Sequence, residues 1–201
     1  WGGSGWTGDG ADGSDEWAPE LLDELGVTLD DDDGTFWMAF DDFARHFRQV
    51  YVCRVLRDDE WLTARCRGRW EGESAGGCGN SGAARYVRNP QLRLRVGGDV
   101  PVDVLLFLEP HDDRLEDGAD GDRAIGFSVY ANGGRRLTRL ARAIVKSGSF
   151  SFARSVLAEA SLPPGAYTLI PCTFEPDQEA DFSVRAHCRR DAGATLELSE
   201  L

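Results

Sequence analysis

The sequence has 201 residues, which is room for one large domain or for one domain with an additional fragment. It contains 22 basic and 35 acidic residues, and the formal net charge of −13 argues against sequence-independent binding to nucleic acid. The longest apolar run, Val104 to Leu108, is far shorter than the roughly 20 residues of a membrane-spanning helix. The 5 cysteines form no Cys-x-x-Cys pair, which argues against a zinc site or a disulfide framework and is typical of a reduced, cytoplasmic protein.

The first 57 residues predict a small module with little regular structure. The stretch up to Ser14 is rich in Gly and Asp and contains few residues that would pack into a core. A helix is predicted over Pro19–Leu25, with Gly26 as its C-terminal stop. A short strand is predicted at Phe36–Met38. It is followed by a short amphipathic helix over residues 41–48, which has acidic residues in its first turn and basic residues in its last.

From Val50 onward, apolar residues recur at alternate positions, which is the period of a β-strand. Tyr51, Cys53 and Val55 begin this pattern, and apolar and polar residues alternate strictly in Gln91–Val96. Further candidate strands lie at Trp61–Trp70, Val102–Leu108, Ala124–Tyr130, Ser149–Ala160, Ala166–Ile170, Asp181–Cys188 and Ala194–Leu198. We therefore predict a mostly β protein. An antiparallel β-sandwich of about eight strands spans residues 58–201, and a small α+β fragment spans residues 1–57.

A run of four aspartates, Asp30 to Asp33, precedes Gly34 and invites comparison with an EF-hand calcium loop. With Gly34 at the sixth position of such a loop, Leu29 would occupy the first position and Phe40 the twelfth. Both positions require oxygen ligands, so the EF-hand interpretation fails. Two interpretations stay open for Asp31, Asp33 and their neighbours: a calcium site of another kind, or a solvated acidic turn.

A second acidic segment, Glu109 to Asp122, carries 7 acids in 14 residues between two predicted strands. As a loop at the edge of a sandwich it would either bind calcium or dock on a basic surface. The alternative is an ordinary solvated loop. The acids in question are Glu109, Asp112, Asp113, Glu116, Asp117, Asp120 and Asp122.

Cys78 lies in a glycine-rich stretch that superficially resembles the surroundings of a thiol-protease nucleophile. Such a nucleophile needs a thiol of low pKa, supplied by a helix N-terminus or a paired histidine. No helix is predicted after Cys78, so we interpret it as a small buried thiol in a loop. No glycine-rich phosphate loop, HExxH motif or serine nucleophile elbow is present, and the residues alone therefore predict a non-catalytic sandwich.

The order of several short motifs is specific. Trp1-Gly2, Trp6-Thr7-Gly8, Asp15-Glu16-Trp17 and Asp33–Met38 together resemble the end of the calpain protease core. Downstream pieces resemble the C2-like β-sandwich of calpains: Arg69-Trp70, Ser74–Cys78, Asn89-Pro90-Gln91, Leu162–Tyr167 and Ile170–Pro176. Within that family, His46–Val55 and Asn89–Arg95 are most similar to the plant phytocalpains of the Defective Kernel 1 type.

This resemblance implies the regulatory and structural C-terminal part of a calcium-dependent, calpain-type cysteine endopeptidase that performs limited proteolysis inside the cell. The family's catalytic Cys, His and Asn would all precede Trp1, which would form one wall of the active site, so the chain alone is expected to be inactive. The implied partners are the rest of the protease core and, through the parent protein, protein substrates. The alternative is a stand-alone C2-like module that binds calcium, lipid or protein without any protease.

Calcium is the cofactor that the resemblance implies. Its ligands would map to Gly5, Asp12, the carbonyl of Asp31, Asp33 and Thr35, and a weak site is expected because Gly5 and Thr35 replace carboxylates. Membrane lipid, contacted through calcium, is a further implied partner. The expected location is cytoplasmic, and similarity to the phytocalpains implies a multi-pass plasma-membrane parent with this part in the cytosol.

Overall fold

The structure, a computed structural model, describes residues 6–11, 14–15, 17–26, 36–50, 52–111, 123–190 and 193–201. Contacts divide the chain into two units, Trp1–Val55 and Leu56–Leu201. Within the described ranges, no helix combines the length and apolarity needed to cross a bilayer.

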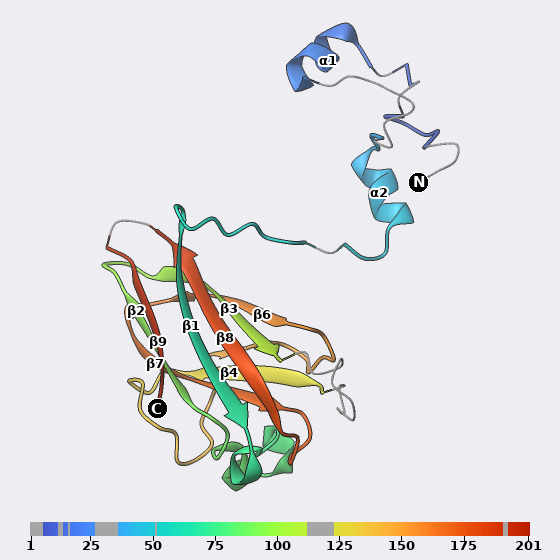
Figure 1. Ribbon diagram of the computed structural model, residues 1–201. Helices are drawn as coiled ribbons and strands as arrows, with labels where there is room; N and C mark the ends of the chain where they lie inside the picture. The colour runs from blue at the N-terminus through green and yellow to red at the C-terminus, as the bar shows by residue number, and fades with distance from the viewer. Residues whose placement is uncertain are drawn as a thin grey trace. The chain divides into compact units, whose positions relative to one another are not determined.

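Two short helices form the regular structure described in the first unit, which is blue to cyan in Figure 1. Helix α1 spans Pro19–Leu25 as predicted, and Gly26 ends it in the left-handed conformation at φ 63°. Helix α2 spans Phe40–His46, with acidic residues in its first turn and basic residues in its last. Neither helix contains a buried residue.

The predicted strand at Phe36–Met38 is wrong, because the structure shows no regular element there. The strand-like pattern that continues to Val55 is also not realised in residues 52–55. A strand needs a hydrogen-bonded neighbour, and none of the described strand pairings reaches either segment. Val52 and Val55 are instead 78% and 80% exposed.

The second unit is a sandwich of two antiparallel sheets, which confirms the predicted fold (Figure 1). One sheet has the strand order β1-β8-β3-β6 and the other the order β5-β4-β7-β2-β9. The strands are β1 Trp61–Trp70, β2 Leu92–Gly97, β3 Val102–Pro110, β4 Ile125–Tyr130, β5 Val145–Lys146, β6 Val156–Leu162, β7 Gly165–Thr173, β8 Ala180–Arg189 and β9 Thr195–Glu200. Three helical turns, η1 Gly72–Ser74, η2 Gly79–Ser81 and α3 Ala83–Tyr86, join β1 to β2.

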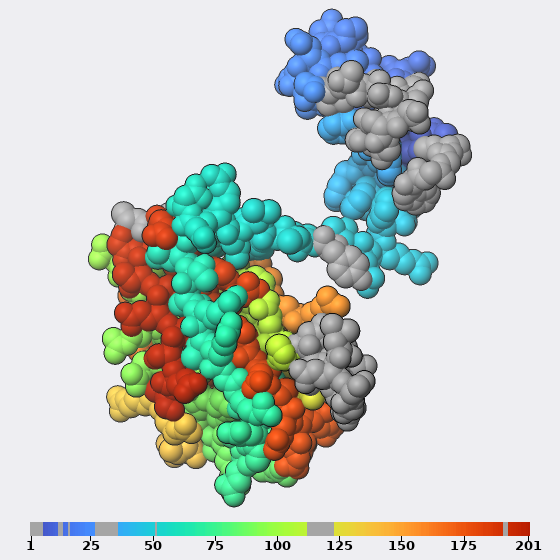
Figure 2. Space-filling model, in the orientation of Figure 1, coloured from blue at the N-terminus to red at the C-terminus, as the bar shows by residue number. Residues whose placement is uncertain are grey.

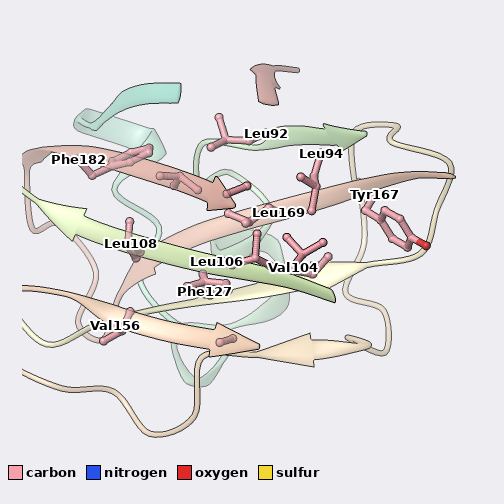
Figure 3. Packing of buried hydrophobic residues seen from close by; sticks show 14 of the residues in the cluster. Leu92, Leu94, Val104, Leu106, Leu108, Phe127, Val156, Tyr167, Leu169 and Phe182 are labelled. Atoms are coloured by element: carbon pink, nitrogen blue, oxygen red, sulfur yellow. The ribbon is translucent and has the colours of Figure 1, made fainter. Parts of the chain in front are cut away.

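The core lies between the two sheets, where each strand contributes every second side chain (Figure 3). Leu92 and Leu94 of β2 are fully buried on one side, and Val104, Leu106 and Leu108 of β3 are fully buried on the other. This packing explains why apolar and polar residues alternate strictly in the sequence of β2. A polar residue at one of these inward positions would face the opposite sheet without water.

Trp70 at the end of β1 joins the two sheets. Its side chain is fully buried, and its indole N–H donates a 3.1 Å hydrogen bond to the carbonyl of Pro171 in β7. Its ring lies 4.5 Å from that of Phe182, centroid to centroid. The indole therefore fills the space between the sheets and also pairs a backbone carbonyl that water does not reach.

The strand boundaries differ from those predicted in one large case. The pattern predicts a single strand over Ser149–Ala160, whereas β6 begins only at Val156, and Ser151 makes an isolated bridge to Ile125. Phe152, which continues the alternating pattern, is 71% exposed. The two-residue strand β5 and the four-residue helix α3 are too short to show a period, and the sequence pattern missed both.

Limited proteolysis tests the division between the two units. Elastase, which cleaves after small aliphatic residues, should cut first between Gln49 and Val55, because Val50, Val52 and Val55 are exposed in an irregular segment. Mass spectrometry should then identify a resistant fragment that begins near Leu56. First cuts within Trp61–Arg189 would contradict this prediction.

Candidate functional site

Most of the predicted site residues lie outside the described residues: Trp1, Asp12, Asp31, Asp33, Asp112, Asp113, Glu116, Asp117, Asp120 and Asp122. The exception is Glu109, whose surroundings can be described. Within the described ranges there is no group of three or more His, Cys, Asp or Glu side chains with metal-ligand geometry.

The segments that flank Asp12 and Asp33 do come together in the first unit. The backbone N–H of Ala39 donates to the carbonyl of Asp9 at 3.3 Å, and Gly10, at φ 80°, lies close enough to Met38 that a Cβ there would be 3.5 Å from its nitrogen. The indole of Trp17 donates to the carbonyl of Ala11 at 2.8 Å. Two stretches about thirty residues apart in the sequence, around Asp9 and around Ala39, are thus in contact.

Glu109 lies on the outer face of the β1-β8-β3-β6 sheet, near the end of β3. Its carboxylate pairs with the guanidinium of Arg185 on the neighbouring strand β8, and both side chains are about one third exposed or less. The first residue of the predicted acidic segment is thereby engaged by a basic group of the sandwich. The pairing of this chain segment with β8 extends to His111, whose backbone N–H donates a 2.7 Å hydrogen bond to the carbonyl of Asp181.

A surface hollow of about 930 Å³ adjoins this pair. It is lined by three arginines at alternate positions of β1, namely Arg65, Arg67 and Arg69, and by Glu109, Asp181 and Ser183. Figure 2 shows this face of the sandwich, with β1 in teal between the red side chains of β8 and β9. Pro90–Leu92, Arg136, Glu200 and Leu201 complete part of its wall.

His187 lies on the same sheet face and is only 4% exposed. Its Nδ1 is 2.9 Å from the hydroxyl oxygen of Thr63 on β1, and its ring meets that of Phe107 edge-on at 5.5 Å. Burial lowers the pKa of His187 below its ordinary value of 6.5; nearby Arg185 and Arg65 also lower this pKa, while Glu109 raises it. The imidazole is therefore held in its neutral form.

The lowered pKa of His187 predicts a pH dependence of stability. In the unfolded chain this histidine protonates near 6.5, above its pKa in the folded chain, so stability is fully present above that pH and is lost as the pH falls. In His187→Leu, the loss of stability between pH 7.5 and 5 should be smaller than in the original chain, as measured by urea unfolding. His111→Gln, at an exposed histidine, should keep the original slope, and an equally steep slope in His187→Leu would contradict the assignment.

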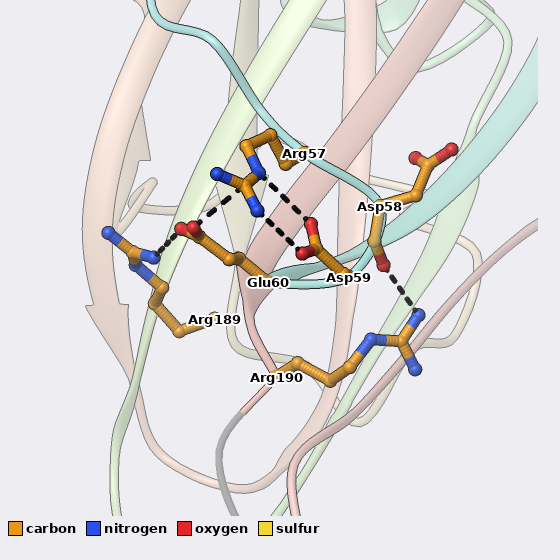
Figure 4. Close-up of polar contacts among 6 residues, drawn as sticks. All are labelled: Arg57, Asp58, Asp59, Glu60, Arg189 and Arg190. Atoms are coloured by element: carbon orange, nitrogen blue, oxygen red, sulfur yellow. Dashed lines mark hydrogen bonds and ion pairs between the residues drawn. The ribbon is translucent and has the colours of Figure 1, made fainter.

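A polar cluster that the sequence pattern did not reveal fixes the entry of the chain into the sandwich (Figure 4). Arg57 donates two hydrogen bonds to Asp59, at 3.2 and 2.8 Å, and Arg189 at the end of β8 donates to Glu60 at 2.5 Å. Arg190 donates to the carbonyl of Asp58 at 3.2 Å. The run of charged residues Arg57–Glu60 is visible in the sequence, but its partners are not. The register of β1 with β8 places it against Arg189 and Arg190.

Cys78 is buried, as predicted, but the expectation that no helical structure follows it is wrong. Cys78 directly precedes η2, and α3 begins at Ala83. Asn89 organises this loop through its buried amide, which accepts from Gly76 N–H and donates to the carbonyls of Gly77 and Tyr86. Cys172, also buried, has a pKa raised by its burial and by nearby Cys78, so the thiol of Cys172 stays neutral and unreactive.

Comparison with known proteins gives two family matches that together cover most of the chain. A model of domain III of the calpain large subunit matches residues 66–187, and a model of the calpain family cysteine protease matches residues 1–54. The chain is 36% identical to the calpain-1 catalytic subunit of Gallus gallus over 233 aligned residues and 34% identical to that of Homo sapiens. It is 34% identical to calpain-9 of Rattus norvegicus. These alignments cover all of this chain and 32% of each relative.

Proposed function

This chain belongs to the calpain family, and we propose that it is a regulatory and structural part of a calpain-type cysteine endopeptidase. In this proposal residues 1–55 complete a protease core formed with other parts of the parent protein, and the sandwich of residues 56–201 supports and regulates that core. The chain spans 32% of the length of the curated relatives it matches. Proteolysis is therefore proposed for the parent protein, with proteins as its substrates.

Incompletely buried aromatic side chains of the first unit carry this proposal. Ala11 is the only buried residue among those described in this unit, whereas Trp37, Phe40 and Phe47 are 40%, 78% and 38% exposed. Trp17 and Trp37 contact each other edge-on at 5.7 Å. So much exposed aromatic surface, with one buried residue among those described in the unit, is typical of a fragment that packs on a larger body.

The test uses the full-length parent and a fluorescent casein substrate. Trp37→Ala should lower kcat/KM at least tenfold. The lost packing contact is expected to cost more than roughly 1.4 kcal/mol, which corresponds to a tenfold fall in the fraction of correctly assembled protease core. Phe152→Ala, at a 71% exposed aromatic residue of the sandwich, is the matched control and should leave kcat/KM unchanged. A parent that does not cleave casein would instead favour the stand-alone binding module.

We further propose a weak calcium site in the first unit, with Asp12 and Asp33 as its carboxylates. Its support is the contact between Asp9–Gly10, which precede Asp12 in the sequence, and Met38–Ala39, which follow Asp33. Asp31 would add a backbone carbonyl. Carboxylate and carbonyl oxygens are the ligands that calcium prefers, and bound calcium would fasten the two segments together.

Calorimetric titration with calcium checks this site. The 201-residue chain should release or absorb binding heat that disappears when Asp12→Asn and Asp33→Asn are combined, because two anionic ligands are lost. The matched control combines Asp112→Asn and Asp113→Asn and should retain the heat. Heat that survives the first pair and vanishes in the second would move the metal to the acidic segment Glu109–Asp122. No heat in any variant would leave regulation to protein contacts.

A further inference from the structure

Among the described residues, the outer face of β8 contains three buried polar atoms for which the structure shows no hydrogen-bond partner. They are Ser183 Oγ, Arg185 Nε and His187 Nε2, which belong to alternate residues of the strand and therefore share one face of the sheet. Polar groups in folded proteins are almost always paired once they are buried. Three exceptions in one row indicate unused hydrogen-bonding capacity on this strip of the sandwich.

The strand register concentrates positive charge on the same strip. Arg65 of β1 lies directly opposite Arg185 of β8, and Arg67 lies opposite Ser183, so three arginines start from neighbouring positions. Side chains of like charge at opposed positions repel each other. Arg185 is neutralised by Glu109, whereas Arg65 and Arg67 are exposed and make no ion pair with any described carboxylate.

Arg69, the next arginine on β1, behaves differently. It donates to Asp181 at 3.0 Å and lies 3.7 Å from Glu71, so two carboxylates compensate its charge. Carboxylates are therefore available to pair with an arginine at this end of β1. Of the three arginines on β1, Arg65 and Arg67 have no described carboxylate partner.

We propose that Arg65, Arg67 and Ser183 form a binding site for a phosphate-class dianion in the hollow beside β1. Arg65 and Arg67 contribute two positive charges that no described carboxylate pairs, and a phosphomonoester or inorganic phosphate would neutralise both, whereas a single carboxylate would not. Guanidinium forks match the tetrahedral oxygens of phosphate, and the serine hydroxyl adds a neutral donor. Arg65 and Arg67 bind the anion, while Arg185 on the neighbouring strand stays paired with Glu109.

The groups of this site come from β1, β3 and β8 of the sandwich, so they are separate from the calcium site proposed for the first unit. Glu200 from β9 also lines the hollow and would oppose an anion there. Removing this carboxylate should therefore tighten binding, whereas removing either arginine should weaken it. General attraction between charges predicts the same two signs, so the comparison with Arg95, a distant arginine on the other sheet, distinguishes a built site.

The experiment is an NMR titration of the 201-residue chain with inorganic phosphate, with chloride balancing the ionic strength. We expect saturable shifts of the β1 and β8 amides and of the His187 ring. The dissociation constant should rise at least tenfold in Arg67→Gln and fall in Glu200→Gln. Arg95→Gln, which removes an equally exposed arginine from β2 of the other sheet, should leave it unchanged.

A linear response without saturation, or equal weakening in Arg95→Gln and Arg67→Gln, would overturn the proposal. Urea unfolding of each variant checks the fold. Removal of Arg67, a surface arginine that other arginines repel, should not lower the unfolding midpoint.

A second experiment identifies the source of the phosphoryl group. It measures sedimentation of the chain, without calcium, with phosphatidylcholine vesicles that contain phosphatidic acid. Binding that Arg67→Gln abolishes assigns a lipid headgroup, and phosphate binding without vesicle binding assigns a soluble phosphate.

Discussion

Trp70→Ala should destabilise the sandwich by about 3–5 kcal/mol, a large fraction of the roughly 5–15 kcal/mol that holds a typical domain folded. The indole is fully buried between the sheets, against Phe182, so its removal leaves a cavity that the paired strands can close only in part. The carbonyl of Pro171 also loses its donor. Urea unfolding should show a lower midpoint at an unchanged slope.

Two further variants separate these contributions. Trp70→Phe keeps most of the ring but not the N–H group, and should cost about 1–2 kcal/mol from the orphaned carbonyl and the smaller ring. Trp61→Ala is the matched control at the opposite end of β1, where the ring is only partly buried beneath the guanidinium of Arg189 at 4.6 Å. Equal losses in Trp61→Ala and Trp70→Ala would contradict the role of Trp70 as the link between the sheets.

Asn89→Ala should cost about 2–4 kcal/mol, because it removes all three hydrogen bonds of a fully buried amide at once. These bonds hold the glycine-rich loop that contains Gly76 and Gly77. Gly77 adopts φ 70°, and a Cβ there would lie 2.6 Å from the backbone nitrogen of Pro176, so the loop packs tightly against the β7–β8 connection.

Asn80→Ala is the matched control for this loop, since Asn80 is exposed and lies within η2. It should change the free energy of unfolding by less than about 0.5 kcal/mol. Asn89→Asp should be at least as harmful as the alanine variant, because it keeps the acceptor for Gly76 but turns a carboxylate toward two carbonyl oxygens. A tolerated Asn89→Asp would show that Asn89 does not organise the loop.

The sequence by itself determined where most elements lie. Alternation in Leu92, Leu94 and Val96 is a local property of the chain, and it identified β2 to within one residue at each end. The proline and glycine around α1 act on their own backbone and fixed both ends of that helix. The motifs that resemble calpains are likewise short and local, and their order along the chain was enough to identify the family.

The tertiary structure decided which strand lies beside which, because pairing depends on how loops close and which faces bury together. The segments Phe36–Met38 and Val52–Val55 have suitable side chains for strands but pair with no described strand, and they are irregular. Pairing of β1 with β8 placed Arg65 against Arg185 and Glu60 against Arg189, contacts across more than a hundred residues. The anion site and the polar cluster at the entry to the sandwich arise from this register, because side chains so distant in the sequence meet only when the sheet has formed.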